Sequence, residues 1–349
     1  MADILAVREL EVEFVTDQGV AHVLDRISLS IAPGEVVGLV GESGCGKTTL
    51  ARAILGILPA GAARIRHGEI RFQGRDLLRE DRDVVNDQVR GRAITFIPQD
   101  PFSSFNPVFT VGTQVMDLMK WKSPRLRGAG RARGGRWPAL FSGYARDRYR
   151  ADRDAVLEMF RAVQIPEPAR ALRRLPHEFS GGQRQRLMIA MALLPSPDLL
   201  IADEPTTALD VTIQAQILRL LRQLVKERGV SVLFTTHDLG TAHEICDRVV
   251  VMYAGQEMEW APTDAFFGRP AHPYTRRLLE SLPSPDAEIR DIPGEVPSLI
   301  APPSGCRFHP RCDQATVECG AGRPAPQTLG HEHGVRCHHP VEGPVRAGA

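Results

Sequence analysis

Hydrophobic and polar residues alternate along the beginning of the chain. Residues 5–16, LAVRELEVEFVT, follow the period of a half-buried strand and lead into a turn. Residues 23–41, VLDRISLSIAPGEVVGLVG, predict two more strands joined at Pro33-Gly34. The next segment, KTTLARAILGIL, has helical spacing from Lys47 and is expected to end at Pro59.

Later in the chain the alternation gives way to continuous apolar runs. DLLIADEP at residues 198–205 and GVSVLFTTH at residues 229–237 predict fully buried strands, as found in parallel sheets. The sequence between them has helical periodicity over residues 212–228 and a stop at Gly229. Strand, helix and strand in this order predict a βαβ unit and an α/β fold. Residues 247–262 then predict a hairpin that turns at Ala254-Gly255.

Composition places the chain among soluble globular proteins. Its 349 residues are 43% hydrophobic and 24% charged, and the formal net charge is +1. This balance gives no overall electrostatic signal for nucleic acid or an anionic membrane. The start lacks the features of a secretory signal, and no uncharged apolar run approaches the roughly 20 residues that cross a bilayer. We therefore expect a cytoplasmic, reducing environment, which disfavours disulfides.

Two segments differ from the rest in composition. Residues 120–153 are dense in Arg and Gly, which predicts a solvated surface loop; a loop that contacts phosphate or lipid headgroups is the alternative. From about residue 263 onward proline and cysteine rise and hydrophobic periodicity fades. This change predicts a small separate extension.

A phosphate-binding loop follows the third predicted strand. GESGCGKTT fits the pattern G-x-x-x-x-G-K-[ST], in which backbone N–H groups surround phosphate oxygens at a helix N-terminus. In this pattern Lys47 reaches the β- and γ-phosphates and Thr48 binds Mg²⁺. The predicted nucleotide-binding residues of the loop are Gly41, Glu42, Ser43, Gly44, Cys45, Gly46, Lys47, Thr48 and Thr49. Cys45 is expected to serve as a small loop residue, although a helix N-terminus could lower its thiol pKa.

Two acidic residues end the first buried apolar run. Asp203 is placed to hold the Mg²⁺ shell, and Glu204 is placed to polarise the water that attacks the γ-phosphate. Acidic residues after an apolar run are by themselves weak evidence for a nucleotide-hydrolysis site. A phosphate-binding loop about 155 residues upstream strengthens that evidence.

The segment FSGGQ at residues 179–183 resembles the signature motif of ABC-type ATPases. The chain resembles this family over roughly residues 5 to 262. Gln99 resembles the Q-loop glutamine, Ala208 to Asp210 the D-loop, and His237 the switch histidine. Phe14 resembles the aromatic residue that stacks on adenine, where Tyr is commoner. The resemblance implies an α/β P-loop NTPase fold, an ABC-type nucleotide-binding domain with a helical subdomain and a small Cys-rich C-terminal extension.

The resemblance also implies a role for each motif. Glu204 would be the catalytic base, assisted by Lys47 and His237, and Mg²⁺ would be held by Thr48, Gln99 and Asp203. Ser180 is suited to cap the following helix, whose N-terminus is an anion site. In the family this signature faces ATP bound by a second subunit, and the residues implied here are Ser180, Gly181, Gly182 and Gln183, with Asp210 in the D-loop.

The longer sequence around these motifs, with HPYTRRLLESLP at residues 272–283, resembles ATP-binding subunits of oligopeptide, dipeptide and nickel importers. That resemblance implies a nucleotide-binding domain over 1–262, with its helical subdomain at about 100–195, and an extension over 263–349. It implies a second ATPase subunit, which in this family is a different chain, and two membrane permeases at the cytoplasmic face. A solute-binding protein would deliver a cargo that this sequence leaves open.

Two other classes of function fit single features of the chain. An ABC ATPase that acts on nucleic acid would suit a metal-binding tail, but the near-zero net charge and the single nucleotide-binding unit argue against it. A metalloenzyme built on the tail would lack an evident catalytic acid or base.

Four of the six cysteines lie near the C-terminus, with the spacing C-x5-C-x6-C-x17-C. This spacing lacks the close pair of structural zinc sites and differs from common ferredoxin patterns, so it leaves the bound group open. Zinc held with His309, His331, His333, His338 or His339, free thiols, and a disulfide are alternatives. The family resemblance implies a [4Fe–4S] cluster on Cys306, Cys312, Cys319 and Cys337.

Overall fold

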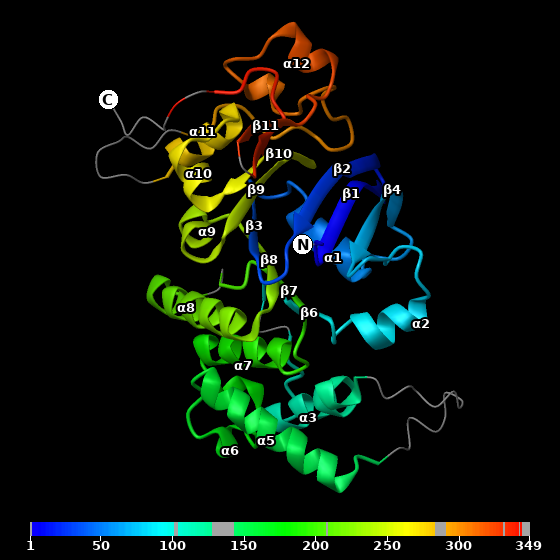
Figure 1. The fold of residues 1–349 in the computed structure, drawn as a ribbon, viewed down its shortest axis with the longest axis vertical. Helices are drawn as coiled ribbons and strands as arrows, with labels where there is room; N and C mark the ends of the chain where they lie inside the picture. Colours follow the sequence, from blue (N-terminus) through cyan, green and yellow to red (C-terminus); the bar gives the residue numbers. More distant parts are fainter. Residues whose placement is uncertain are drawn as a thin grey trace. The chain divides into compact units, whose positions relative to one another are not determined.

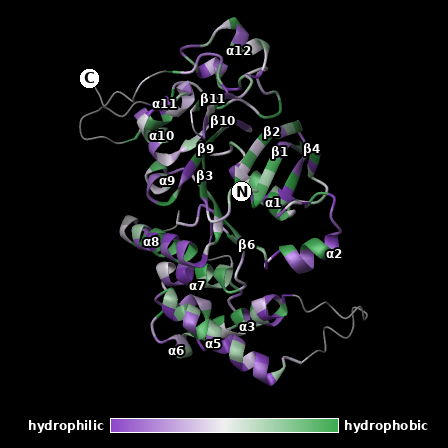
Figure 2. Cartoon of the chain, in the orientation of Figure 1, coloured by the Kyte–Doolittle hydropathy of each residue, from purple (hydrophilic) through white to green (hydrophobic). Residues whose placement is uncertain are grey.

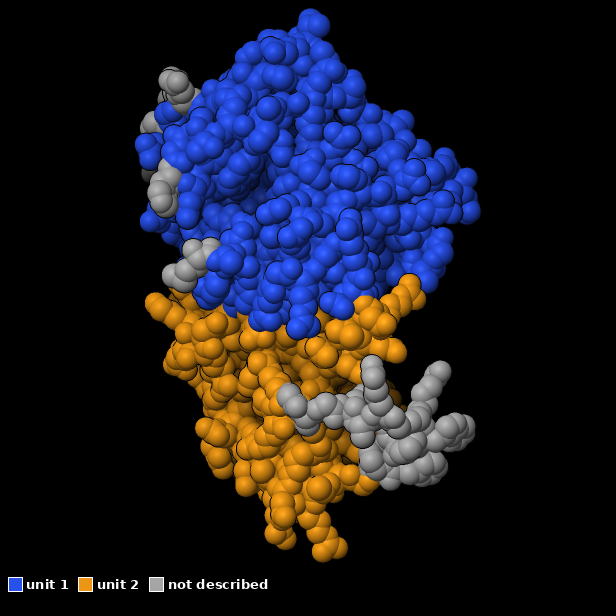
Figure 3. Space-filling model, turned by 45° about the vertical axis from the view of Figure 1, so that its right-hand side comes forward, with its two compact units in different colours: residues 1–80, 231–349 blue, residues 81–230 orange. Residues whose placement is uncertain are grey.

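The computed structural model describes residues 2–100, 104–127, 143–206, 209–282, 291–330, 332–341 and 343. The chain divides into two compact units, shown in different colours in Figure 3. Unit 1 contains residues 1–80 and 231–349, and unit 2 contains residues 81–230. Each unit is described by itself.

Unit 1 combines the beginning and the end of the chain (Figure 1). Its first part contains β1 (Leu5–Thr16), β2 (Gly19–Ile31), β3 (Val36–Val40), α1 (Lys47–Leu55), β4 (Ala63–Phe72) and β5 (Arg75–Asp76). Its second part begins with β8 (Ser231–Thr236), α9 (Leu239–Ile245), β9 (Arg248–Tyr253), β10 (Gln256–Pro262), α10 (Thr263–Gly268) and α11 (Pro273–Glu280). It continues with the 3-10 turn η4 (His309–Arg311), α12 (Val317–Ala321), β11 (Gln327–Gly330) and β12 (His333–Val335).

Two sheets organise unit 1. One is antiparallel, with the strand order β2-β1-β4-β5. In the other, the strands of this unit follow the order β11-β12-β10-β9-β3-β8, and β3 is parallel to both β8 and β9. Every residue of β3 and β8 is buried, and the hydrophobic colour of β3 in Figure 2 reflects this position. Burial on both faces explains why these strands lack alternation.

The sequence predictions for unit 1 hold for its strands and differ for one helix end. The predicted strands correspond to β1, β2, β3 and β8, and the predicted hairpin is formed by β9 and β10. The helix α1 ends at Leu55, before the expected Pro59, because Gly56 takes a left-handed conformation with φ of 62°. The Gly56 N–H donates to the carbonyls of Ala53 and Arg52, as in a helix C-cap.

Two buried glutamates on β10 attach the C-terminal segment to the rest of unit 1. Glu257 is 1% exposed and accepts hydrogen bonds from Arg323 and Arg336. Glu259 is fully buried, accepts from the backbone of Ala271 and His272, and pairs with His333 at 2.9 Å. The strand β12 also pairs with β10. Buried carboxylates are costly unless they are bonded in this way, so removing a partner would destabilise the attachment.

Unit 2 contains a pair of parallel strands, β6 (Ile94–Ile97) and β7 (Leu199–Asp203), and a set of helices. These are α2 (Arg82–Val84), the π-turn η1 (Val85–Val89), α3 (Val111–Lys122), η2 (Pro124–Leu126), α5 (Arg146–Ala162), α6 (Pro168–Ala171), η3 (Pro176–Glu178), α7 (Gly181–Leu193) and α8 (Val211–Arg228).

The helices of unit 2 follow ordinary sequence rules. The predicted helix over residues 212–228 is α8, and Gly229 ends it with φ of 64°. On α5, hydrophobic and hydrophilic residues lie on different faces (Figure 2), and Val156, Leu157, Met159 and Phe160 are buried. Asp152 is a buried exception on α5, and it accepts hydrogen bonds from Ser123, Arg125 and Tyr144. This cluster joins α5 to the segment that follows α3.

Several sequence expectations fall on residues that the structure does not describe. Residues 128–142, the middle of the Arg-rich segment, and Thr207, Ala208 and His331 lie outside the described residues. The division at residue 262 stays a prediction. In the described part of the chain, none of the helices combines the length and apolar character needed to span a membrane.

Candidate functional site

The phosphate-binding loop of unit 1 connects β3 to α1. Gly41, Gly44 and Gly46 have φ of 150°, 80° and 107°, values that favour glycine. A Cβ on Gly41 would lie 2.1 Å from the carbonyl oxygen of Met252, and one on Gly46 would lie 2.8 Å from Leu24. Ser43 and Gly44 are exposed. The glycines therefore allow a tight turn whose middle faces solvent ahead of the α1 N-terminus.

Lys47 is the buried cation of this loop, with 5% exposure. Its Nζ donates to the carbonyl of Gly41 at 2.7 Å and to that of Glu42 at 3.3 Å. The ammonium group is thus held against the loop by neutral acceptors. It remains available to pair with an anion that enters the loop.

Cys45 lies inside the same loop and is 1% exposed. Burial raises the pKa of its thiol, and the charge of Lys47 opposes this shift only in part. The suggestion that the helix N-terminus lowers this pKa is therefore wrong, because removal from water outweighs the nearby positive charge. Cys45 acts as a small, neutral packing residue.

Glu42 is held by side chains from the C-terminal segment, which the sequence did not predict. Its backbone N–H donates to the Tyr274 hydroxyl at 3.1 Å. Its carboxylate pairs with the guanidinium group of Arg311, at 3.0 Å for the closer contact. The only sequence signals were the HPY segment that contains Tyr274 and the position of Arg311 directly before Cys312.

In unit 2, the acidic pair lies at the end of β7. Asp203 is its last residue and is 3% exposed. Glu204 follows with φ of 46°, an unusual conformation for a residue other than glycine. The side-chain amide of Gln99 donates to the Glu204 carboxylate at 2.9 Å. The structure therefore brings together Gln99 and Glu204, which lie 105 positions apart in the chain.

The residues 180–183 begin helix α7 with a capping box. The Ser180 hydroxyl accepts from the Gln183 N–H, and the Gln183 side chain accepts from the Ser180 N–H. A Cβ on Gly182 would lie 2.8 Å from the side chain of Ile213. The box fixes the start of a 13-residue helix, whose N-terminus favours negative charge.

The remaining predicted residues occupy simpler positions. Asp210 caps helix α8 and accepts from the Ile213 N–H at 2.9 Å. His237 is exposed and follows β8 directly. Phe14 is half-buried on β1, opposite Ala21 and Ala63 on the neighbouring strands.

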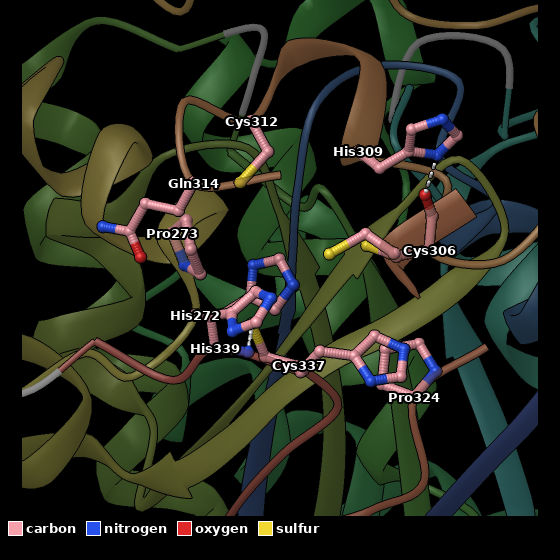
Figure 4. A pocket seen from close by; sticks show the side chains of 11 residues that line it. His272, Pro273, Cys306, His309, Cys312, Gln314, Pro324, Cys337 and His339 are labelled. Carbon is pink, nitrogen blue, oxygen red and sulfur yellow. Dashed lines mark hydrogen bonds between the residues drawn. The ribbon is translucent and has the colours of Figure 1, made fainter. Parts of the chain in front are cut away.

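A small pocket in the C-terminal segment, with room for about one water molecule, collects the four clustered cysteines (Figure 4). It is lined by Cys306, Cys312, Cys319 and Cys337, together with His272, His309, His338 and His339. Burial raises the pKa of the Cys306 thiol to about 11 and that of Cys337 to about 12. These two thiols are therefore neutral at pH 7 when no cation compensates their charge.

His272 contributes a buried polar atom without a partner to this pocket. The residue is 1% exposed, and burial lowers its pKa to about 4, so the ring is neutral. Its Nδ1 accepts from the Tyr274 N–H at 3.0 Å, which leaves the ring proton on Nε2. No hydrogen-bond partner for Nε2 lies among the described residues.

The cysteine pocket is not arranged around a metal ion in the described residues. In the described part of the chain, no group of three or more His, Cys, Asp or Glu side chains could hold a metal ion. An iron–sulfur cluster binds cysteine thiolates through its iron atoms, and the four cysteine side chains line one pocket. Such a cluster also carries sulfur atoms that accept hydrogen bonds, which the free Nε2–H of His272 would satisfy.

Comparison with known proteins identifies the relatives of the chain. Residues 24–207 match the family described as ABC transporter, and residues 258–319 match the oligopeptide/dipeptide transporter C-terminal region. A probable peptide ABC transporter ATP-binding protein from Sinorhizobium fredii is 44% identical, over 96% of this chain and 94% of that protein. The dipeptide transport ATP-binding protein DppD of Bacillus subtilis is 41% identical, over 97% and 95%.

Solved structures give the same fold. One is a dimeric ATP-binding cassette in a post-hydrolysis state, bound to ADP and Pi. It is 25% identical in sequence, with a TM-score of 0.59, and the match covers 74% of this chain and 98% of that one. Another, from Clostridium perfringens, is part of the ABC transporter complex cbiONQ; it is 26% identical, with a TM-score of 0.58 over 76% and 91%.

Proposed function

The chain belongs to the ABC transporter family, with the ATP-binding cassette fold, and from this premise we propose that it powers the import of peptides or similar small solutes by hydrolysing ATP. The observation that carries the ATPase activity is the loop of residues 41–49, which keeps Lys47 buried beside an exposed glycine turn. The match of the C-terminal region and the names of the relatives support peptides as the cargo. None of these relatives supports the nucleic-acid alternative.

The first task of the site is to bind the phosphates. The backbone N–H groups at the start of α1 face the anion, and Lys47 exchanges its carbonyl partners for the β- and γ-phosphates. Thr48, Gln99 and Asp203 would hold Mg²⁺, which neutralises charge on the phosphate oxygens. Phe14 would stack on the adenine.

The second task is to activate water. Glu204 is the proposed general base, and Gln99 holds its carboxylate through the 2.9 Å hydrogen bond. The unusual φ of Glu204 sets the direction of that carboxylate. His237 is exposed and would contact the γ-phosphate.

The signature residues act on a second nucleotide. The N-terminus of α7 is an anion site, and we propose that Ser180, Gly181, Gly182 and Gln183 bind the ATP of a partner ATPase, with Asp210 alongside. Two ATP molecules would then join two subunits, and hydrolysis would release them. The exposed position of Ser180 is consistent with a contact to another chain.

The proposed assembly includes two membrane permeases and a second, different ATPase subunit at the cytoplasmic face of the membrane. A solute-binding protein would take part indirectly, by delivering the cargo to the permeases. The helical region at about 100–195 would contact the permeases, and the region from 263 onward would form the Cys-rich extension.

We also propose that the extension holds a [4Fe–4S] cluster on Cys306, Cys312, Cys319 and Cys337. The shared pocket and the unpartnered Nε2–H of His272 support this group. Zinc is the alternative group, and among the described residues no set of three or more His, Cys, Asp or Glu side chains is placed to hold a metal ion of either kind. The cluster would supply a cross-link for a segment too small to build its own core.

Reconstitution in membrane vesicles tests the transport function. The chain is expressed with candidate permeases and a solute-binding protein from the same organism, and ATP hydrolysis is measured with and without di- and tripeptides. Peptide-dependent hydrolysis and uptake are expected. Hydrolysis that never responds to permeases, or retention of the chain on DNA or ribosomes instead, would contradict the proposal.

A further inference from the structure

We infer that Arg311 and Tyr274 are positioning residues for the phosphate-binding loop, which they hold in its ATP-binding conformation through Glu42. This inference rests on the proposed ATPase function and assigns a role in it to the C-terminal segment. All the residues involved belong to unit 1.

Every polar group of Glu42 has a partner. The N–H donates to Tyr274, and the carboxylate pairs with Arg311. The carbonyl accepts from the Cys45 N–H at 3.2 Å and from Lys47 Nζ at 3.3 Å. Glu42 therefore connects the two C-terminal side chains to the lysine that receives the phosphates.

Arg311 is itself fixed from several sides. Its side chain is 5% exposed, and besides Glu42 its guanidinium group donates to the Tyr253 hydroxyl and to the carbonyls of Ile292 and Pro293. Its two terminal nitrogens each face one oxygen of the Glu42 carboxylate, at 3.0 and 3.4 Å. A fork of this kind sets direction as well as distance, which lysine does not reproduce.

The aromatic residues below the loop give Tyr274 an equally fixed position. Tyr274 is fully buried, and its ring lies 4.7 Å from that of Tyr253 and 5.1 Å from that of Phe308. Its hydroxyl consequently reaches Glu42 from a rigid base. The loop supplies few fixed contacts of its own at this point, because Ser43 and Gly44 are exposed and glycine permits other conformations.

Loss of the contacts that Arg311 and Tyr274 make with Glu42 reduces the fraction of molecules whose loop is ready to bind ATP. If Arg311→Ala lowers that fraction to about one tenth, the apparent Kd for ATP rises about tenfold. The rate at saturating ATP falls little, because the bound nucleotide restores the loop. The measurement is the Kd for Mg·ATP by calorimetry on the full chain, with KM and kcat measured in the assembled transporter.

Arg277→Ala is the matched control. Arg277 is an arginine of the same segment that pairs with Asp313 and Glu280 and does not contact the loop. Its loss removes the same charge, and its Kd is expected to stay within about twofold of the wild type, well under the tenfold change above. Equal values for Arg311→Ala and Arg277→Ala overturn the inference. Failure of the wild-type chain itself to bind ATP would instead refute the proposed function.

A second pair of variants separates positioning from simple charge neutralisation. If Arg311 only neutralises Glu42 beside the phosphates, Glu42→Gln binds ATP at least as tightly as the wild type, and the double variant Arg311→Ala/Glu42→Gln recovers. If the pair positions the loop, Glu42→Gln also weakens binding and the double variant stays as weak as Arg311→Ala. Recovery in the double variant overturns the inference. Because Glu42 is partly exposed, at 26%, its substitution also tests the idea should Arg311→Ala fail to fold.

Discussion

The side-chain amide of Gln99 donates a 2.9 Å hydrogen bond to the carboxylate of Glu204. The pair joins the segment after β6 to the end of β7, and both residues are candidates for work at the γ-phosphate. If Glu204 is the general base, Glu204→Gln keeps the shape of the residue and removes its basicity.

We expect Glu204→Gln to lower the rate of ATP hydrolysis by about 10²–10⁴-fold, the contribution of a positioned base. Binding of ATP is expected to persist, because the phosphate-binding loop is unchanged. Steady-state hydrolysis and nucleotide binding should both be measured on the assembled transporter. Hydrolysis close to that of the wild type would remove Glu204 from the mechanism.

Ser180 combines two roles that a matched variant separates. Ser180 is the N-cap of α7, so Ser180→Ala should lower the free energy of unfolding by about 1 kcal/mol. Thr110→Ala removes a comparable cap, that of α3, without touching the signature residues. Denaturant unfolding should give similar losses for the two variants.

Hydrolysis is where these two variants should differ. Ser180→Ala is expected to reduce turnover by at least about tenfold, by removing a donor to the partner's nucleotide, while Thr110→Ala retains most of it. Equal turnover in the two variants would mean that Ser180 serves only to start its helix.

The cysteine pocket predicts the metal content of the protein. After anaerobic purification the wild type should be brown, with about four iron atoms and four sulfide ions per chain. Cys337→Ala should lose most of this iron. Cys246→Ala is the control, since Cys246 is equally buried but packs against Gly38, outside the pocket. A colourless wild-type protein that contains zinc would refute the cluster.

His272 predicts a pH dependence of stability in the metal-free protein. Its pKa falls from the ordinary 6.5 to about 4 on folding, because burial disfavours the charged ring more than the nearby Glu259 favours it. The unfolded chain therefore binds the proton more readily. The contribution of His272 to stability is complete above pH 6.5 and is lost as the pH falls toward 4, by at most about 3 kcal/mol.

His272→Asn is the matched variant for this effect. Asparagine keeps a side-chain acceptor at the N-cap of α11, where His272 now accepts from Tyr274, but it does not titrate. Urea unfolding between pH 4 and 7 should show a flatter profile for the variant. Parallel profiles would show that His272 does not cause the loss.

Local sequence patterns predicted the local structure well. Alternation located β1, and the glycines at 229 and 255 marked a helix end and a hairpin, where both take positive φ. The end of α1 was misplaced because Gly56, rather than the more conspicuous Pro59, supplied the cap. Helix spacing alone does not decide between two such residues.

Contacts between distant segments were not predictable in the same way. Nothing in the pattern around Glu42 indicates Arg311, because the pairing depends on how β10 and its buried glutamates attach the C-terminal segment. The pKa of Cys45 was misjudged for a related reason. Cys45 is buried by the fold around the loop, where the Gly255 N–H bonds its carbonyl at 3.0 Å, and the loop sequence does not contain that information.

The pairing of Glu42 with Arg311 has a consequence for the order in which the protein matures. The two residues are separated by 269 positions, so at a synthesis rate of about 5–20 residues per second the second appears roughly 13–54 s after the first. During that interval a nascent chain has its phosphate-binding loop but not the side chains that hold it. Products of premature termination would therefore compete poorly for cellular ATP, and full affinity would arrive only with the last part of the chain.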